Sequence, residues 1–176
     1  MRIFQSDKEK RIAEGIRKGS HTAMKELYDE WSGYLFALCL RYVPDRETAG
    51  DILQDSLVKI FSNAGSFRYK GPGSLKAWIS RIAVNEALQY LRKKKGGEMI
   101  EYKDSLPDIV SEEPEEADIG KIPANVLQKM IEELPEGYRT IFNLFVFEEM
   151  SHKEIAAALG ISESTSASQF HRARKL

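Results

Sequence analysis

Apolar residues recur along the chain at steps of three and four, which is the spacing of one face of an α-helix. Three such faces precede residue 95 and two follow residue 122. Their members are Leu27, Trp31, Tyr34, Leu35, Leu38 and Tyr42; Ile52, Leu53, Ser56, Leu57, Ile60 and Phe61; Leu75, Trp78, Ile79, Ile82, Ala83, Leu88 and Leu91; Val126, Leu127, Met130, Ile131 and Leu134; and Tyr138, Ile141, Phe142 and Phe145. Because no sustained alternating strand pattern accompanies them, the sequence predicts an all-α protein.

The stretch "GGEMIEYKDSLPDIVSEEPEEADIGK", residues 96–121, breaks this periodicity. It opens on two glycines, contains two prolines and has no sustained apolar period, which is typical of a linker. We therefore expect two small helical domains, 1–95 and 122–176, joined by an acidic flexible linker. Helix-boundary signals support helical domains, since Gly19-Ser20 is typical of the end of one helix and the cap of the next. Pro123 suits a first helical position.

The net charge of −1 hides an uneven distribution. Residues 1–95 carry 18 Lys or Arg against 11 Asp or Glu, whereas residues 96–122 carry 2 against 9. Salt screens exposed charges beyond about 8–10 Å, so the local surplus matters more than the total. The first half has basic residues available for phosphates. The acidic linker is either simply solvated, or it mimics DNA and covers a basic surface before DNA binds.

The residue inventory argues against catalysis, metal binding and a membrane span. Cys39 lies in an apolar run and reads as a small buried thiol. The three histidines form no metal-ligand spacing, and no nucleophile stands beside a base; His21 and His152 read as surface residues in a first helical turn. No apolar stretch approaches the roughly 18 residues that span a membrane. We expect a cytoplasmic protein that is not an enzyme and has no cofactor or small-molecule substrate.

The C-terminal stretch, from Ser151 onward, has the signals of a helix-turn-helix. Ser151 and Glu154 match a capping box, Gly160 supplies a turn residue with positive φ, and Ser162 caps the next helix. On that second helix we expect Phe170 to face inward together with Ala173. The residues expected to face DNA are Ser164, Thr165, Ala167, Ser168, His171, Arg172 and Lys175. An ordinary αα-hairpin is the alternative, but the polar second helix favours DNA binding.

Two features of the N-terminal half carry further information. Asp51, Gln54 and Asp55 fall on one helix face, where a merely solvated surface would also explain them. The following loop and helix interleave aromatic, basic and amide residues, the combination that binds unstacked single-stranded nucleic acid. The members of this second set are Phe67, Arg68, Tyr69, Lys70, Ser74, Lys76, Trp78, Arg81 and Asn85. Trp78 fits either this site or the core, because its spacing with its apolar neighbours is helical.

Three motifs together resemble the extracytoplasmic-function type of the bacterial sigma-70 family. They are "AGDILQDSLVKIF", "SFRYKGPGSLKAWISRIAVNEALQYLRKK" and "LPEGYRTIFNLFVFEEMSHKEIAAALGISESTSASQFHRARKL". The resemblance covers about residues 8–95, as sigma region 2, and 122–176, as sigma region 4. It departs from the family at Gly50, where an acidic residue is usual, at Ser166, where an apolar one is common, and at Ala167, where Lys or Arg is frequent.

The resemblance implies a function and partners. Asp51, Gln54 and Asp55 match the surface that binds the β′ clamp helices of core RNA polymerase. The Phe67–Ser74 loop, with Trp78 and Asn85, matches the site that melts the −10 element of promoter DNA. The last helix matches the reader of the −35 element, next to the β flap. A further implied partner is an anti-sigma factor, which could hold the chain at the inner membrane.

Two other classes of function are alternatives to the sigma-factor interpretation. A helix-turn-helix activator with an unrelated N-terminal sensor domain would keep the terminal motif, but it would leave the acidic face and the loop unexplained. A nuclease or recombinase fails on the missing catalytic residues.

Overall fold

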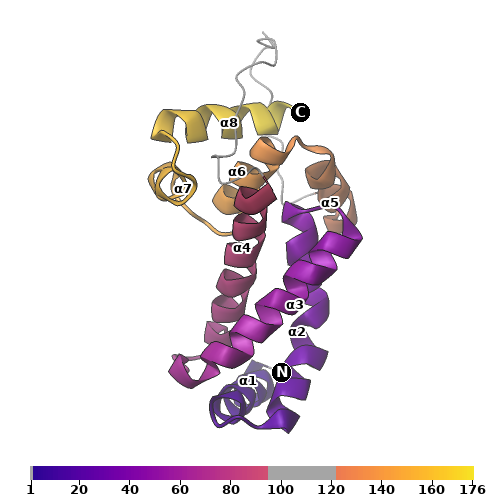
Figure 1. Ribbon diagram of the computed structural model, residues 1–176, viewed down its shortest axis with the longest axis vertical. Helices are drawn as coiled ribbons and strands as arrows, with labels where there is room; N and C mark the ends of the chain where they lie inside the picture. The colour runs from indigo at the N-terminus through magenta and orange to yellow at the C-terminus, as the bar shows by residue number, and fades with distance from the viewer. Residues whose placement is uncertain (1, 95–121) are drawn as a thin grey trace. The chain divides into compact units, whose positions relative to one another are not determined.

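The computed structural model describes residues 2–94 and 122–176, with side chains from residue 7 onward (Figure 1). These residues form two compact units, Met1–Tyr90 and Leu91–Leu176. The regular elements of the described residues are all helical, which confirms the predicted fold class. The predicted linker, 96–121, lies outside the described residues. None of the described helices combines the length and the apolar character that crossing a membrane requires.

The N-terminal unit is built on α1 (Arg2–Arg17), α2 (His21–Tyr42), α3 (Arg46–Asn63) and the part of α4 (Ser74–Lys94) up to Tyr90, with a short 3-10 turn, η1 (Ala64–Ser66), after α3. Local chemistry sets the helix starts. Gly19 adopts a φ of 76°, which favours glycine, and Ser20 then caps α2 through the amide of Ala23. Asp45 caps α3 in the same way, through the amide of Thr48.

The core of this unit is apolar and uses the predicted helix faces. Leu27, Leu35 and Ile60 are fully buried, as are Leu75 and Ile79 of α4. Side-chain bonds also join α4 to its neighbours. The Tyr34 hydroxyl lies 3.0 Å from Ser80 Oγ, and Lys59 of α3 forms an ion pair with Glu86.

Cys39 of α2 belongs to the same core. It is a free, fully buried cysteine, and burial raises the pKa of its thiol to about 12. The thiol is therefore protonated and unreactive at neutral pH, which confirms the expected buried role.

The C-terminal unit contains four shorter helices: α5 (Ala124–Glu133), α6 (Glu136–Val146), α7 (His152–Leu159) and α8 (Glu163–Lys175). Its apolar cluster consists of Ile131, Leu134, Tyr138, Phe142 and Ala173, with Leu127, Val146, Phe147 and Phe170 packed against it. Pro123 is the residue before α5 rather than its first residue. Val126 and Met130 remain exposed, so α5 buries only the side that carries Ile131.

The helix-turn-helix forms as the sequence predicts. Ser151 and Glu154 make both halves of the capping box, and Gly160 ends α7 in the left-handed conformation with a φ of 68°. The amide of Ile161 donates to the carbonyl of Ala156 at 3.1 Å, and Ser162 caps α8 through the amide of Thr165. Each of these signals acts within a few residues, and for that reason the turn could be predicted from sequence.

Candidate nucleic-acid interface

The acidic face of α3 lies opposite the side that packs into the core. Asp51, Gln54 and Asp55 are all exposed, whereas Ile52 and Ile60 are buried. Within the described part of the chain, none of the three polar residues makes a hydrogen bond or an ion pair. A structural role therefore does not account for them.

Val58 continues the acidic face by one helical step. Its side chain is 64% exposed, which is unusual for a β-branched apolar residue on a helix. The face therefore combines two carboxylates, an amide and an apolar side chain, a mixture suited to contact with another protein.

The loop after η1 is anchored at its start by Phe67. This ring is only 7% exposed and packs on Trp78 with 4.8 Å between ring centroids. Phe67 was predicted to contact DNA, but its burial places it beneath the surface in this conformation. Trp78 is half-buried, so it has one part in the packing with Phe67 and another facing solvent. The packing role of Trp78 is therefore confirmed in part, and its role at the DNA site stays a prediction.

Internal bonds fix the rest of the loop. Ser74 Oγ donates to the carbonyl of Gly71 at 2.7 Å and accepts from the amide of Lys70 at 3.2 Å. Gly71 and Gly73 adopt φ values of 128° and 84°, which a side chain would strain. The Gly71-Pro72-Gly73 segment therefore makes a closed turn. The hydroxyl of Ser74 holds that turn together rather than being left for DNA.

The basic and polar side chains around this turn point to solvent. Arg68 is exposed and donates to the carbonyls of Gly65 and Phe67, at 3.0 and 3.1 Å. The side chain of Lys70 is exposed and that of Tyr69 is half-buried. Aromatic and cationic residues thus follow one another along this loop.

Helix α4 divides the other predicted residues between two faces. Trp78, Arg81 and Asn85 are three and four residues apart, so they lie on one face, and the last two are exposed. Lys76 lies on the other face, where its ammonium group sits over the ring of Tyr34, 4.3 Å from the centroid. The loop and the Trp78 face can form one binding surface, whereas Lys76 belongs to a neighbouring one.

Helix α8 presents a polar outer face. Ser164, Ser168 and His171 are exposed at positions four and three residues apart. Four further predicted residues are half-buried beside them: Thr165, Ala167, Arg172 and Lys175. On the inner side Ala173 is buried, and Phe170 stacks on Phe142 with 6.0 Å between centroids. The expected inward side of this helix is confirmed by the burial of Ala173 and the packing of Phe170, whereas contact of the other side with DNA stays a prediction.

His152 departs from the sequence-based interpretation. It was expected on the surface, but it is half-buried, and its Nδ1 lies 3.0 Å from the hydroxyl of Ser166, which is fully buried. Its ring also stacks on Phe145 with 4.5 Å between centroids. The sequence marked Ser166 as a departure from the family, at a position where an apolar residue is common. The structure shows that it bonds α8 to the first turn of α7.

A helix-turn-helix with an exposed polar second helix defines a DNA-binding protein, and here the same chain carries a second helical unit with an aromatic and basic loop. Comparison with known proteins shows which DNA-binding proteins this chain resembles. The family model for Sigma-70 region 2 matches residues 27–96, and the model for Sigma-70, region 4 matches residues 124–176.

Individual relatives agree with these matches. The RNA polymerase sigma factor SigV of Bacillus subtilis (strain 168) is 30% identical over 141 residues, covering 80% of this chain and 80% of that protein. The ECF RNA polymerase sigma factor SigW of the same organism is 29% identical over 177 residues, covering 94% of this chain and 92% of that protein. Among solved structures, the sigma factor RpoE in complex with the anti-sigma factor NepR from Bartonella quintana aligns with a TM-score of 0.48 and 25% identity, covering 86% of this chain and 91% of that chain.

The chain belongs to the sigma-70 family, as a sigma factor of the extracytoplasmic-function type. It is therefore an RNA polymerase sigma factor, a class of non-enzymatic transcription initiation factors. The match to region 2 accounts for the N-terminal half, which the alternative of a helix-turn-helix activator would leave unexplained.

Proposed function

We propose that this sigma factor works through two domains joined by a linker. In this proposal, residues 1–95 bind core RNA polymerase and open the −10 element, residues 122–176 read the −35 element, and residues 96–121 link them. Two DNA contacts held on one polymerase reinforce each other, so neither needs high affinity alone. This arrangement explains how a chain with a net charge of −1 can act on DNA.

The observation that carries the proposal is the acidic face of α3. Exposed carboxylates in the basic half of the chain repel DNA, and Asp51, Gln54 and Asp55 have no partner within the described part of the molecule. Such a face is explained if a protein binds there. We assign it to the clamp helices of the polymerase β′ subunit, in line with the resemblance to sigma region 2.

The double variant Asp51→Arg/Asp55→Arg tests this assignment. Because both side chains are exposed and unpaired within the described residues, the helicity and the thermal midpoint should stay close to the parent's. Co-purification with core polymerase should be lost. Asp7→Arg/Glu14→Arg is the matched control, since it makes the same charge change at two exposed residues of α1 and should leave assembly intact. Assembly of the α3 variant at the parent's level would move the polymerase contact elsewhere.

We assign strand opening to the loop at residues 67–74 and to Trp78, Arg81 and Asn85 of α4. A base leaving the duplex needs a ring to stack on, at roughly 1–3 kcal/mol per base, and cations for its phosphates. In this proposal, Trp78 and Tyr69 supply the rings and Lys70 supplies the cation.

The variant Tyr69→Ala/Lys70→Ala tests the loop and keeps the bond from the backbone amide of Lys70 to Ser74, because only side chains are removed. We expect normal binding to duplex promoter, but lower permanganate reactivity of the −10 thymines. A pre-melted template should restore much of the transcript yield. Opening of duplex DNA at the parent's rate would remove the loop from the melting site.

We assign reading of the −35 element to the outer face of α8. Arg172→Ala should lower the slope of log affinity against log salt by about one unit if the guanidinium binds phosphate. If it reads guanine instead, the cost should be roughly 1–3 kcal/mol at one base position.

We further propose a cytoplasmic location, with an anti-sigma factor as an additional partner and with catalysis left to the polymerase. All three proposals follow from the resemblance to sigma factors of this type. Fractionation of cells with and without co-expressed membrane proteins would test whether an anti-sigma factor holds the chain at the inner membrane.

A further inference from the structure

Glu9 of α1 forms hydrogen bonds to the backbone at the start of α4, far along the chain. Its side chain is only 8% exposed, and both carboxylate oxygens accept hydrogen bonds from backbone amides. Oε2 lies 2.8 Å from the amide of Gly73, and Oε1 lies 2.8 Å from the amide of Leu75. These amides stand 64 and 66 residues further along the chain, at the end of the loop and in the first turn of α4.

This connection supplies a helix cap from a distance. The first amides of a helix have no partner inside the helix, and the residue before it usually provides one from its own side chain. The residue before α4 is Gly73, which has no side chain. Glu9 takes that place, and its negative charge also suits the positive end of the helix dipole. Two charge-assisted bonds to one carboxylate fix both the position and the direction of the backbone there.

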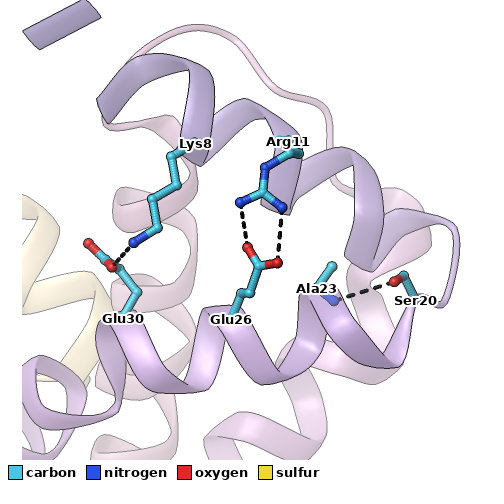
Figure 2. Close-up of polar contacts among 6 residues, drawn as sticks. All are labelled: Lys8, Arg11, Ser20, Ala23, Glu26 and Glu30. Atoms are coloured by element: carbon cyan, nitrogen blue, oxygen red, sulfur yellow. Dashed lines mark hydrogen bonds and ion pairs between the residues drawn. The ribbon is translucent and has the colours of Figure 1, made fainter. Parts of the chain in front are cut away.

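Helix α1 is itself held firmly enough to act as the fixed side of this contact. Arg11 binds Glu26 of α2 through two bonds of 2.9 and 2.6 Å, and Lys8 forms an ion pair with Glu30 (Figure 2). Figure 2 shows both basic side chains reaching from α1 to the same helix. Ile12 is fully buried beside them. The burial of Ile12 packs α1 into the core of the unit, and the two ion pairs add contacts to α2.

The loop depends on such an anchor because of its own sequence. Gly71 and Gly73 carry no side chains that could pack the turn against the rest of the unit. The bonds of Ser74 close the turn from inside, to Gly71 and Lys70, but they do not tie it to the rest of the unit. At this end of the loop, Glu9 and the packing of Leu75 into the core provide that tie.

We propose that Glu9 is a positioning residue for promoter opening, which holds the end of the Gly71–Gly73 turn so that Tyr69, Lys70 and Trp78 meet the extruded base together. The inference rests on the proposed role of the loop in strand opening. It gives α1 a function in DNA melting although Glu9 itself touches no DNA.

The test uses the full chain assembled with core polymerase, with the variants Glu9→Gln and Glu9→Ala. Glutamine keeps the size of the side chain but has only one oxygen acceptor, so it can hold one of the two amides. Glu14→Gln is the matched control, because Glu14 is an exposed glutamate of the same helix. Opening of duplex promoter is followed by 2-aminopurine fluorescence at the −10 element, and exchange of the Gly73 and Leu75 amides by mass spectrometry.

We expect Glu9→Gln to slow opening by about tenfold, the factor for one lost bond to a charged group, and Glu9→Ala to slow it further. Amide exchange at residues 73–75 should rise in the same order. Polymerase assembly, which depends on α3, should stay within twofold of the parent, and a pre-melted template should restore initiation. The Glu14→Gln control should match the parent in each measurement.

A general folding defect would give a different result. In that case assembly would fall together with opening and the pre-melted template would not help, and the positioning role would be overturned. Opening at the parent's rate in both Glu9 variants would also overturn it, provided that Tyr69→Ala/Lys70→Ala is slow. If that loop variant opens normally, the proposed role of the loop fails, and the inference about Glu9 fails with it.

Discussion

Glu9 of the N-terminal unit and Gln169 of the C-terminal unit are both buried polar side chains, but they differ in their hydrogen bonding. In the N-terminal unit, Glu9, Ser56 and Ser80 are buried, and each has a hydrogen-bond partner. In the C-terminal unit, Thr140 is similarly satisfied by the carbonyl of Glu136. Gln169, however, is fully buried, and neither atom of its amide group has a hydrogen-bond partner among the described residues.

This difference in hydrogen bonding has consequences for the stability of the two units. A buried carboxylate with two amide partners ties distant segments of the N-terminal unit together. A buried amide without partners costs the C-terminal unit about 1–3 kcal/mol. We therefore expect it to be the less stable unit.

The largest expected effect comes from truncating one core isoleucine in each unit. Ile141 and Ile60 are both fully buried, so either change to alanine should cost about 2–5 kcal/mol. Both tryptophans, Trp31 and Trp78, lie in the N-terminal unit, so their fluorescence reports on that unit alone. Ile141→Ala should lower the transition seen by far-ultraviolet circular dichroism but leave the fluorescence transition in place.

Ile60→Ala serves as the matched control, since it should shift the tryptophan transition. If Ile141→Ala shifts the fluorescence transition equally, the two units unfold together, and a comparison of their separate stabilities loses its meaning.

A smaller effect, of opposite sign, is expected at the unpaired amide. Methionine has a similar volume and helix propensity to glutamine but no group that needs a hydrogen bond. Gln169→Met should therefore stabilise the C-terminal unit by about 1–3 kcal/mol in urea unfolding followed by circular dichroism. Gln54→Met of α3 is the control, because that side chain is exposed and makes no bond within the described residues, so the change should stay within about 0.5 kcal/mol. A loss of stability in Gln169→Met would mean that the buried amide is satisfied.

The contacts that could be predicted from sequence are the local ones. The capping box of Ser151 and Glu154, the left-handed Gly160 and the cap at Ser162 each depend on residues within three or four positions. The helix faces followed from periodicity for the same reason. Local geometry repeats from one protein to another, so residue types alone indicate it.

The contacts that could not be predicted join residues far apart in the chain. Nothing near Glu9 in the sequence indicates that it caps a helix 64 residues away. The bond between His152 and Ser166 crosses two helices, although a polar residue at an inward position of α8 was a signal that a partner existed. The burial of Phe67 depends on Trp78 lying against it, which only the folded loop determines.

The smallest expected effect concerns acid and the helix-turn-helix. Hydrogen bonds from the hydroxyl and the amide of Ser151 hold the pKa of Glu154 below its ordinary value of 4.5. A lowered pKa in the folded state means that the carboxylate stabilises the fold above pH 4.5, and this contribution is lost as the pH falls through the folded value. Ser151→Ala removes both the hydroxyl bond and the cap, so the thermal midpoint should fall at pH 7 and by less at pH 3.5.

In Glu154→Gln the same pattern is expected, and the double variant should show less than the sum of the two losses, because both residues belong to one capping box. Equal losses at both pH values would show that the ionised carboxylate does not contribute to the stability of this turn.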